Sequence, residues 1–355
     1  MKDVQRQTRS YLMTLFQQHG INPRGDLGQN FLIDVNLIEF AVRNAELGPS
    51  DLVLEVGSGT GGMTAFLARD AGKVITVDVD KNMSALAAEA VKDFNNVTLV
   101  NQDILKNKNT LAPEVVALIL EQLSQLKDGR FKLVANLPYS VGTPVISNLI
   151  ASELPWQRMV CTIQWELAEK MVAEPATSKY GALSVWIQSQ ASVRILRKLG
   201  PKVFWPRPKV DSAIISIWSN REAAARIDNR RFFLDFLRRM FSQRRKHLRS
   251  VLIGMYRKQI SKETVDALLA ELQHKPDDRA ELLDVATLIR LGNRVSQAVT
   301  ESGIAVDEES DSDDSADDTG SEDVSSVRKS KHNGGSRSHE QDDESQEEET
   351  ADTDV

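Results

Sequence analysis

The sequence has only one cysteine, Cys161, among 355 residues, so an intrachain disulfide is excluded. No stretch approaches the roughly 18–20 apolar residues that a membrane-spanning helix needs. The N-terminal segment lacks the apolar run and small-residue cleavage site of a secretory signal. The five histidines are scattered, without metal-ligand spacing. These absences predict a cytoplasmic protein that has no resident metal and no membrane partner.

Acidic residues outnumber basic ones, but the excess lies in one segment. Residues 303–355 hold 19 acidic and 4 basic residues, a net charge of −15, while the remainder holds 32 acidic and 40 basic residues, a net charge of +8. The basic part predicts a polyanionic partner. The tail has too little apolar surface to offset its chain entropy, so we expect it to be disordered. It is interpreted as a solubilising segment or as a nucleic-acid mimic.

Apolar runs alternate with helical patterns over residues 26–222, which predicts an α/β domain with a parallel sheet covered on both faces. Helices are expected at Gly62–Ala71 and Lys81–Lys92. The last two apolar runs flank a proline-rich turn and are expected to close the sheet as a hairpin. The predicted strands are Leu52–Val56, Val74–Val77, Val97–Val100, Lys132–Ala135, Met159–Ile163, Val193–Lys198 and Ala213–Trp218.

Three other segments complete the predicted organisation. Residues 1–25 are expected to form a helical extension, and residues 106–128 an inserted amphipathic helix of unassigned task. Residues 223–302 are helical in pattern and basic, which predicts a second, smaller domain before the tail at 303–355.

Polar residues recur where the first three strands end. The first strand leads into Gly57-Ser58-Gly59-Thr60-Gly61-Gly62, where glycines permit a sharp turn and close approach of a ligand to main-chain N–H groups. The second strand ends at Asp78 and the third precedes Asp103. Each acid alone could be a solvated loop residue, and the loop alone could bind a dinucleotide, although its spacing differs from that fingerprint. Together they predict a nucleoside cofactor at the carboxyl edge of the sheet.

The fourth strand is followed by Asn136-Leu137-Pro138-Tyr139, which by itself could be an ordinary proline turn. With its surroundings, the chain resembles the ribosomal RNA adenine dimethylases over about residues 20–300, most closely their small-subunit (16S) branch. The resemblance is carried by residues 28–32 (GQNFL), 55–61 (EVGSGTG), 102–103 (QD), 136–139 (NLPY), 143–144 (TP), Gln164 and Glu166, 180–181 (YG) with 183–184 (LS), 204–212 (FWPRPKVDS) and 241–246 (FSQRRK).

This resemblance implies a Rossmann-like class I methyltransferase sheet followed by a small all-helical RNA-binding domain. It implies S-adenosylmethionine as cofactor and dimethylation of N6 on two adjacent adenosines near the 3′ end of 16S rRNA, during ribosome biogenesis. The implied partner is the rRNA or pre-30S particle, and the implied state is a monomer.

The resemblance also implies a set of cofactor-binding residues. Asn30 and Leu32 would cover S-adenosylmethionine, Gly57 would meet its methionine end, and Asp103 its adenine amino group. Asp78, where the family usually has Glu, would hold the ribose. The remaining implied cofactor residues are Gln29, Glu55, Gly59, Gly61 and Asn136.

The chemistry of N6 methylation explains the tetrapeptide. The adenine amine is a poor nucleophile because its lone pair is delocalised into the ring. Hydrogen bonds from N6 to the Asn136 oxygen and to a carbonyl near Leu137 or Pro138 would favour a pyramidal nitrogen. The base must leave its stack and be gripped on aromatic faces, for which Tyr139 and, by the resemblance, Phe204 are suited. No strong general base is needed.

Basic residues crowd the start of the predicted helical domain. Arg244, Arg245, Lys246 and Arg249, beside Arg238 and Arg239, are interpreted as phosphate contacts, although a solvated basic face is an alternative. Three other functions are also compatible with these sequence features. They are a large-subunit rRNA methylase of the antibiotic-resistance type, a DNA N6-adenine methyltransferase, and a non-enzymatic ribosome-assembly factor on the same fold.

Overall fold

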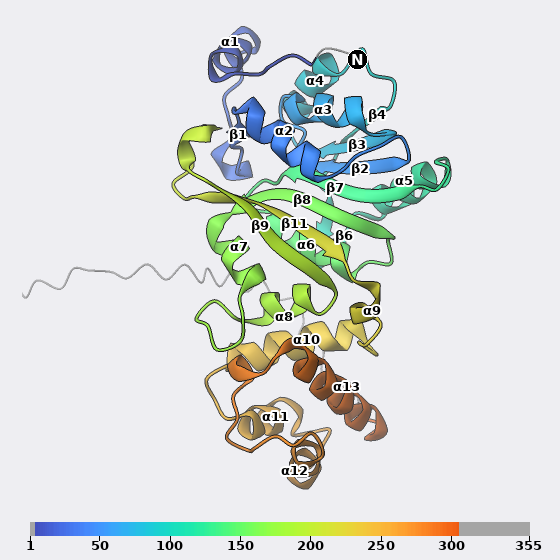
Figure 1. The fold of residues 1–355 in the computed structure, drawn as a ribbon, viewed down its shortest axis with the longest axis vertical. Helices are drawn as coiled ribbons and strands as arrows, with labels where there is room; N and C mark the ends of the chain where they lie inside the picture. The colour runs from blue at the N-terminus through green and yellow to red at the C-terminus, as the bar shows by residue number, and fades with distance from the viewer. Residues whose placement is uncertain (1–3, 305–355) are drawn as a thin grey trace, which may run out of the picture. The chain divides into compact units, whose positions relative to one another are not determined.

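A computed structural model of the protein describes residues 4–304 (Figure 1). Its centre is a seven-stranded sheet in the order β4-β3-β2-β7-β8-β11-β9. All pairs from β4 to β8 are parallel, whereas β11 is antiparallel to both β8 and β9. The strands are β2 (Asp51–Val56), β3 (Lys73–Asp78), β4 (Val97–Asn101), β7 (Arg130–Asn136), β8 (Trp156–Gln164), β9 (Ala191–Leu199) and β11 (Ser212–Ser219).

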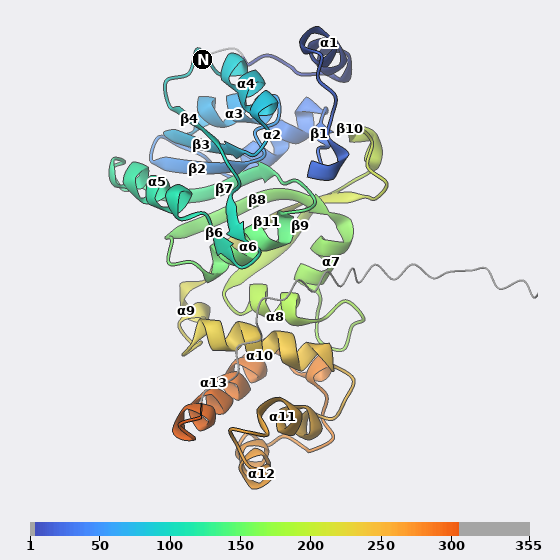
Figure 2. The ribbon, with the colours of Figure 1, turned by 180° about the vertical axis from the view of Figure 1, so that it is seen from behind.

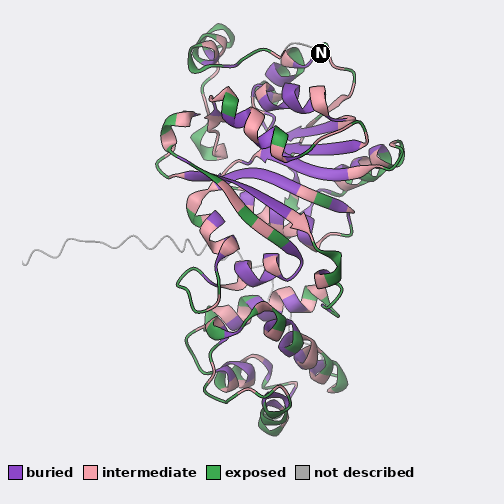
Figure 3. Cartoon of the chain, viewed as in Figure 1, coloured by how far each residue is buried: buried purple, intermediate pink, exposed green. Residues whose placement is uncertain are grey.

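This sheet confirms the predicted fold class and the predicted strands. Each apolar run lies within a strand, and β9 and β11 form the expected antiparallel pair. The central strands are buried along almost their whole length, while much of β9 is exposed (Figure 3). The continuous apolar runs were informative because a strand covered on both faces needs apolar side chains at every position. Of the predicted acidic tail at 303–355, residues 305–355 lie outside the described residues.

Helices cover both faces of the sheet, and alternate residues of each strand point to opposite faces. Val53 of β2 packs with α2 (Val35–Asn44) and α3 (Gly62–Asp70) on one face. Leu52 and Leu54 pack on the other face, in the cluster that contains residues of α5 (Pro113–Ser124) and α6 (Gly142–Ala151). Helix α4 (Lys81–Ala90) joins β3 to β4 and contacts both.

Residues 106–128 connect β4 to β7 rather than standing apart from the sheet. They contain most of the short hairpin of β5 (Leu105–Asn107) and β6 (Thr110–Leu111), and then α5. Val115 and Ile119 of α5 are buried in the core, so this helix is the crossover connection between two parallel strands.

The C-terminal helices continue the core on one side of the sheet (Figure 2). Helix α10 (Arg230–Ser242) begins at Asn229, whose side chain accepts a hydrogen bond from Phe232 N. It packs against α8 and α13, and Gly292 of α13 allows the ring of Phe233 to approach closely. The other elements are α7 (Trp165–Val172), α8 (Ala182–Gln188), α9 (Arg221–Ala224), α11 (Leu248–Tyr256), α12 (Lys262–Glu271) and α13 (Val285–Glu301).

The N-terminal region packs against helix α4 and pairs with a strand from residues 204–205. Helix α1 (Arg9–His19) buries Leu12 and Phe16 against Met83 and Leu86 of α4. After it, β1 (Phe31–Leu32) pairs with β10 (Phe204–Trp205) in a separate two-stranded sheet. These contacts hold the segment between α1 and β1 beside the carboxyl ends of β3 and β7.

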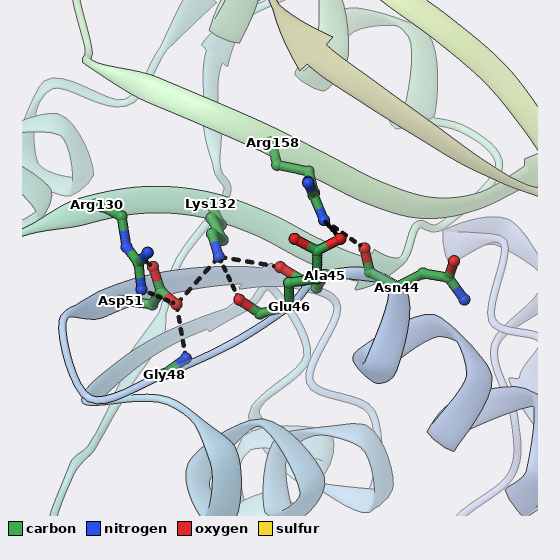
Figure 4. Close-up of polar contacts among 8 residues, drawn as sticks. All are labelled: Asn44, Ala45, Glu46, Gly48, Asp51, Arg130, Lys132 and Arg158. Carbon is green, nitrogen blue, oxygen red and sulfur yellow. Dashed lines mark hydrogen bonds and ion pairs between the residues drawn. The ribbon is translucent and has the colours of Figure 1, made fainter.

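A polar network fixes the opposite, amino end of the central strands (Figure 4). The buried Lys132 ammonium donates to Asp51 Oδ2 at 3.0 Å and to the carbonyls of Ala45 and Glu46 at 3.0 and 2.7 Å. Arg130 pairs with the other Asp51 oxygen at 2.8 Å. Burial lowers the pKa of Lys132, and the paired carboxylate and carbonyls offset this desolvation. Strand β7 is therefore anchored at the end opposite to Asn136.

Candidate active site

A pocket lies at the carboxyl ends of β2, β3 and β7. Residues 27–31, here called the covering segment, line it from the other side. The position of the pocket is the one expected for a ligand of an open α/β sheet. The structure brings together most of the predicted site residues here, namely Gln29, Asn30, Gly57, Gly59, Asp78, Asn136, Leu137, Pro138 and Tyr139.

Two glycines shape the pocket floor, and both have positive φ. A Cβ on Gly57 (φ 83°) would lie 3.1 Å from the Pro138 ring, and a Cβ on Gly59 (φ 50°) would lie 3.1 Å from the Phe31 ring. Only glycine combines this backbone conformation with such close approach. The glycine loop therefore packs directly against the Asn-Leu-Pro-Tyr turn on one side and the covering segment on the other.

The Asp78 carboxylate organises the loop as well as lining the pocket. Oδ2 accepts hydrogen bonds from Gly59 N at 3.0 Å and Ser58 Oγ at 3.2 Å, and Oδ1 accepts one from Asp80 N at 2.9 Å. Burial raises the pKa of Asp78, although the hydrogen bonds oppose this shift. Oδ2 therefore uses both of its lone pairs, whereas Oδ1 has one left for a ligand hydroxyl.

Glu55 lies in the sheet beneath the loop and does not line the pocket. Its Oε2 accepts hydrogen bonds from the hydroxyls of Thr64 and Thr76, at 2.6 and 2.7 Å. The side chain is completely buried, and this desolvation raises its pKa to about 8. At neutral pH the carboxyl is therefore largely protonated.

The covering segment is tied to the sheet by its own polar side chains. Gln29 Nε2 donates to Asp80 Oδ2 at 3.0 Å, and Gln29 Oε1 accepts from Arg24 N at 2.8 Å. Asn30 Nδ2 donates to Gly28 O at 3.1 Å. The main chain of Asn30, rather than its side chain, makes the contact with the Asn-Leu-Pro-Tyr turn.

That contact orients Asn136. Its Nδ2 donates to Asn30 O at 2.8 Å. If the amide were flipped, Asn136 Oδ1 would face Asn30 O, and these two acceptors would repel each other. Asn136 Oδ1 is consequently left buried without a hydrogen-bond partner. Buried polar atoms are rarely unsatisfied, so this acceptor at the pocket wall is suited to an N–H group of a ligand.

The rest of the tetrapeptide has defined contacts. Leu137 N donates to Thr162 O of β8 at 3.2 Å, and Pro138 O accepts from Val141 N at 3.1 Å, so the latter carbonyl already closes a turn. The Tyr139 hydroxyl lies 2.5 Å from Ser212 Oγ. Burial raises the pKa of Tyr139, and this contact holds its ring at the pocket.

Besides Glu55, four predicted residues do not line this pocket. Gly61 lies against α4, where a Cβ would be 2.8 Å from Ala90 Cβ. Leu32 and Phe204 pair across β1 and β10 with their side chains in the core, 7% and 3% exposed. Asp103 is exposed, and its Oδ1 accepts from Leu105 N at 2.8 Å. Successive side chains of a strand point to opposite sides. The Phe204 ring therefore points into the core, and the next ring, Trp205, lies near Phe31 at the pocket wall.

The sequence interpretation missed Val79 and Met83, which line the pocket beside Asp78. Val79 is 53% exposed. In the sequence, an aliphatic residue directly after the strand-end acid was a signal for an apolar ligand face. Met83 on α4 gave no such signal, because its spacing is that of an ordinary helix core position.

The predicted basic residues divide into two groups. Arg244 donates to the carbonyls of Ser178 and Tyr180, at 2.9 and 3.0 Å, and Arg249 pairs with Asp266 at 2.5 Å. Arg245 and Lys246, between them, are exposed.

Residues 4–304 contain no group of three or more His, Cys, Asp or Glu side chains placed to hold a metal ion. Across the same residues, no helix is both long and apolar enough to span a bilayer.

A sheet of this order, with a glycine loop and an amide at its carboxyl edge, defines a class I methyltransferase fold. The model of the family "Ribosomal RNA adenine dimethylase" matches residues 20–291, so the chain belongs to this family. The small-subunit rRNA methyltransferase A of Pediococcus pentosaceus is 36% identical over 296 residues, 82% of this chain and 96% of that protein. The protein of the same name from Geobacillus kaustophilus is 33% identical, over 79% and 94% of the two chains.

Solved structures agree with this assignment. A dimethyladenosine transferase from Plasmodium falciparum has a TM-score of 0.62 at 25% identity, covering 77% of this chain and 98% of its own. The 23S rRNA methyltransferase ErmE has a TM-score of 0.52 at 23% identity, over 75% and 100% of the chains, which shows a shared fold. Class I rRNA methyltransferases use S-adenosylmethionine as methyl donor.

Proposed function

We propose that the protein dimethylates N6 of two adjacent adenosines near the 3′ end of small-subunit rRNA, using S-adenosylmethionine bound in the pocket between Gly57, Asp78 and Asn30. The observation that carries this proposal is the buried, unpartnered Asn136 Oδ1 beside the glycine loop. The relatives at 33–36% identity are named for the small subunit, whereas the likeness to ErmE is one of fold, which favours the small-subunit substrate.

The pocket residues fit this cofactor. Gly57 and Gly59 leave room that a side chain would fill. Asp78 offers its Oδ1 to a ribose hydroxyl, and Val79 and Met83 offer apolar contacts. S-adenosylmethionine, when bound, supplies an electrophilic methyl group on a sulfonium. The protein then needs to hold its acceptor in line with that methyl group, and such positioning is a large part of catalysis.

The tetrapeptide performs this positioning. Asn136 Oδ1 accepts a hydrogen bond from the N6 amine and reduces delocalisation of the nitrogen lone pair into the ring. The Tyr139 ring, fixed by the contact of its hydroxyl with Ser212, offers a face to the extruded base. Pro138 O is occupied by Val141 N, so Leu137 O is the candidate for a second acceptor.

The helical residues 223–302 are proposed to bind the rRNA backbone, through Arg245 and Lys246, while Arg244 holds the helices to the 178–180 loop. Action as a monomer is part of this proposal. We propose the rRNA of a pre-30S particle as the substrate and the cytoplasm as the place of action.

The test is methyl transfer to small ribosomal subunits that lack the modification. We expect tritiated S-adenosylmethionine to label them, and mass spectrometry to find N6,N6-dimethyladenosine at adjacent positions. Asn136→Ala should abolish labelling while cofactor affinity is retained, and Asn95→Ala, at an exposed asparagine, should behave as wild type. Labelling of large subunits instead, or full activity of Asn136→Ala, would contradict the proposal.

A further inference from the structure

The glycine loop is held on its pocket side by Asp78, and a second residue holds it from the opposite end of the loop. Gln7, in the extended segment before α1, is 7% exposed. Its Nε2 donates to Thr60 O at 2.8 Å, and its Oε1 accepts a hydrogen bond from the Thr60 hydroxyl. Both the donor and the acceptor of the Gln7 amide therefore bond to one residue, Thr60, which lies 53 positions later in the sequence.

Thr60 is a position where such support matters. It lies between Gly59 and Gly61, which both have positive φ, and it is itself 4% exposed. Glycines permit this conformation without favouring it, because they have the largest conformational entropy to lose. Asp78 fixes Ser58 and Gly59 through their hydrogen bonds, and Gln7 fixes the next residue. The loop backbone is thus pinned on both sides of Gly59, which lines the pocket.

The surroundings of Gln7 are built to receive it. A Cβ on Gly62, at the start of α3, would lie 3.0 Å from Gln7 Oε1, so the absence of a side chain at Gly62 leaves room for the amide. Helix α1 begins two residues after Gln7 and packs through Leu12 and Phe16 onto Met83 of α4. In both ribbon views α1 lies beside α4 (Figures 1 and 2). Gln7 is therefore held in place by a packed helix.

We infer that Gln7 is a positioning residue for the cofactor, which fixes the glycine loop in its binding conformation through Thr60. This inference rests on the proposed binding of S-adenosylmethionine in the pocket. Gln7 lies before residue 20, where the match to the family model begins. The segment that contains Gln7 does not line the pocket. Its role in cofactor binding is indirect, through the conformation of the glycine loop.

The test compares cofactor and RNA parameters of Gln7→Met, which keeps the length of the side chain but removes both hydrogen bonds. Leaving a buried carbonyl and hydroxyl without partners destabilises the binding conformation of the loop, and S-adenosylmethionine must then order the loop when it binds. We expect KM and Kd for S-adenosylmethionine to rise about tenfold, while KM for the ribosomal substrate and kcat at saturation change less than about twofold. Gln7→Glu, which keeps the acceptor but replaces the donor to Thr60 O by a buried charge that repels this carbonyl, should show a rise of the same kind.

Two controls separate positioning from a general loss of structure. Gln5→Ala changes an exposed glutamine of the same segment and should leave all parameters unchanged. Thr60→Val removes the hydroxyl that donates to Gln7. In the double variant with Gln7→Met, the rise in Kd for S-adenosylmethionine should be smaller than the two single effects combined, because the two residues act through one contact.

Unchanged Kd for S-adenosylmethionine in both Gln7 variants, with a wild-type protein that binds it, would overturn the inference about Gln7 alone. An equal rise of KM for cofactor and RNA would also overturn it. A wild-type protein that does not bind S-adenosylmethionine in calorimetry would instead overturn the proposed function, and the role of Gln7 with it.

Discussion

The side chain of Asn136 and the main-chain carbonyl of Asn30 are joined by a 2.8 Å hydrogen bond that spans 106 positions of the sequence. This bond determines which end of the Asn136 amide is free. It also joins the segment that covers the pocket to the strand that carries the proposed catalytic turn. The site is therefore assembled by a contact between two segments that are distant in sequence.

We expect Asn136→Asp to reduce methyl transfer about 100-fold, the size of effect seen when one aligned hydrogen-bonding group is lost from an active site. A carboxylate cannot donate to Asn30 O, and its charge would repel that carbonyl. Single-turnover labelling with saturating cofactor measures this effect. Activity within about threefold of wild type would show that the amide orientation is unimportant.

Asp78→Ala should weaken S-adenosylmethionine binding at least tenfold, or about 1.4 kcal/mol, because Asp78 lines the pocket and holds Gly59. Asp103→Ala should weaken it less, since Asp103 is exposed and bonds to Leu105 N. Calorimetric titration of both variants decides between the two acids. A larger loss for Asp103→Ala would show that the bound state differs from the described pocket.

The stability of the free protein should depend on the ionisation of Glu55. Its native pKa of about 8 lies above the ordinary value of 4.5, so the native state retains a proton that the unfolded chain loses between these pH values. The contribution of Glu55 is fully present below pH 4.5 and is lost as pH rises through 8. Between pH 5 and 8, wild type should lose about 3 kcal/mol more unfolding free energy than Glu55→Gln.

Urea denaturation at both pH values measures this difference, without cofactor. Glu114→Gln, at an exposed glutamate, serves as control and should follow wild type. Parallel pH profiles of wild type and Glu55→Gln would mean that Glu55 is ionised in the native state.

The basic residues should separate by function. Arg245→Ala and Lys246→Ala should each lower RNA affinity and reduce the slope of log K against log salt by about 1, as expected for a lost phosphate contact. Arg244→Ala should instead lower Tm, because its guanidinium bonds two carbonyls and pairs with Glu281 at 3.7 Å. Filter binding across a salt series and thermal unfolding give the two readouts. An Arg244 variant with normal Tm and a reduced salt slope would reverse this division.

The fold was predictable because its signals are local. The strands β2, β3, β4, β7 and β8 each contain a mainly apolar run, the glycine loop directly follows β2, and Asp78 ends β3. The carboxyl ends of parallel strands meet at one edge, so a strand assignment alone was sufficient to place Gly57, Asp78 and Asn136 together.

Residues 106–128 were harder to interpret, because an amphipathic helix has the same pattern in an insertion as in a crossover connection. Phe204 and Trp205 presented the same difficulty. Two adjacent aromatic residues in a two-residue strand point to opposite sides, and which side is the core depends on the pairing of β10 with β1. No local pattern contains that information.

The sequence by itself determined the sheet, its glycine loop, the tetrapeptide and the family, because these are encoded in contiguous residues. Only the tertiary structure decided the free oxygen of Asn136, the protonation of Glu55, the paired state of Arg244 and the contact of Gln7 with Thr60. Each of these depends on hydrogen-bond partners or burial supplied by segments 9 to 106 positions away. The ionisation of a carboxyl and the orientation of an amide respond to that three-dimensional environment, which residue order does not specify locally.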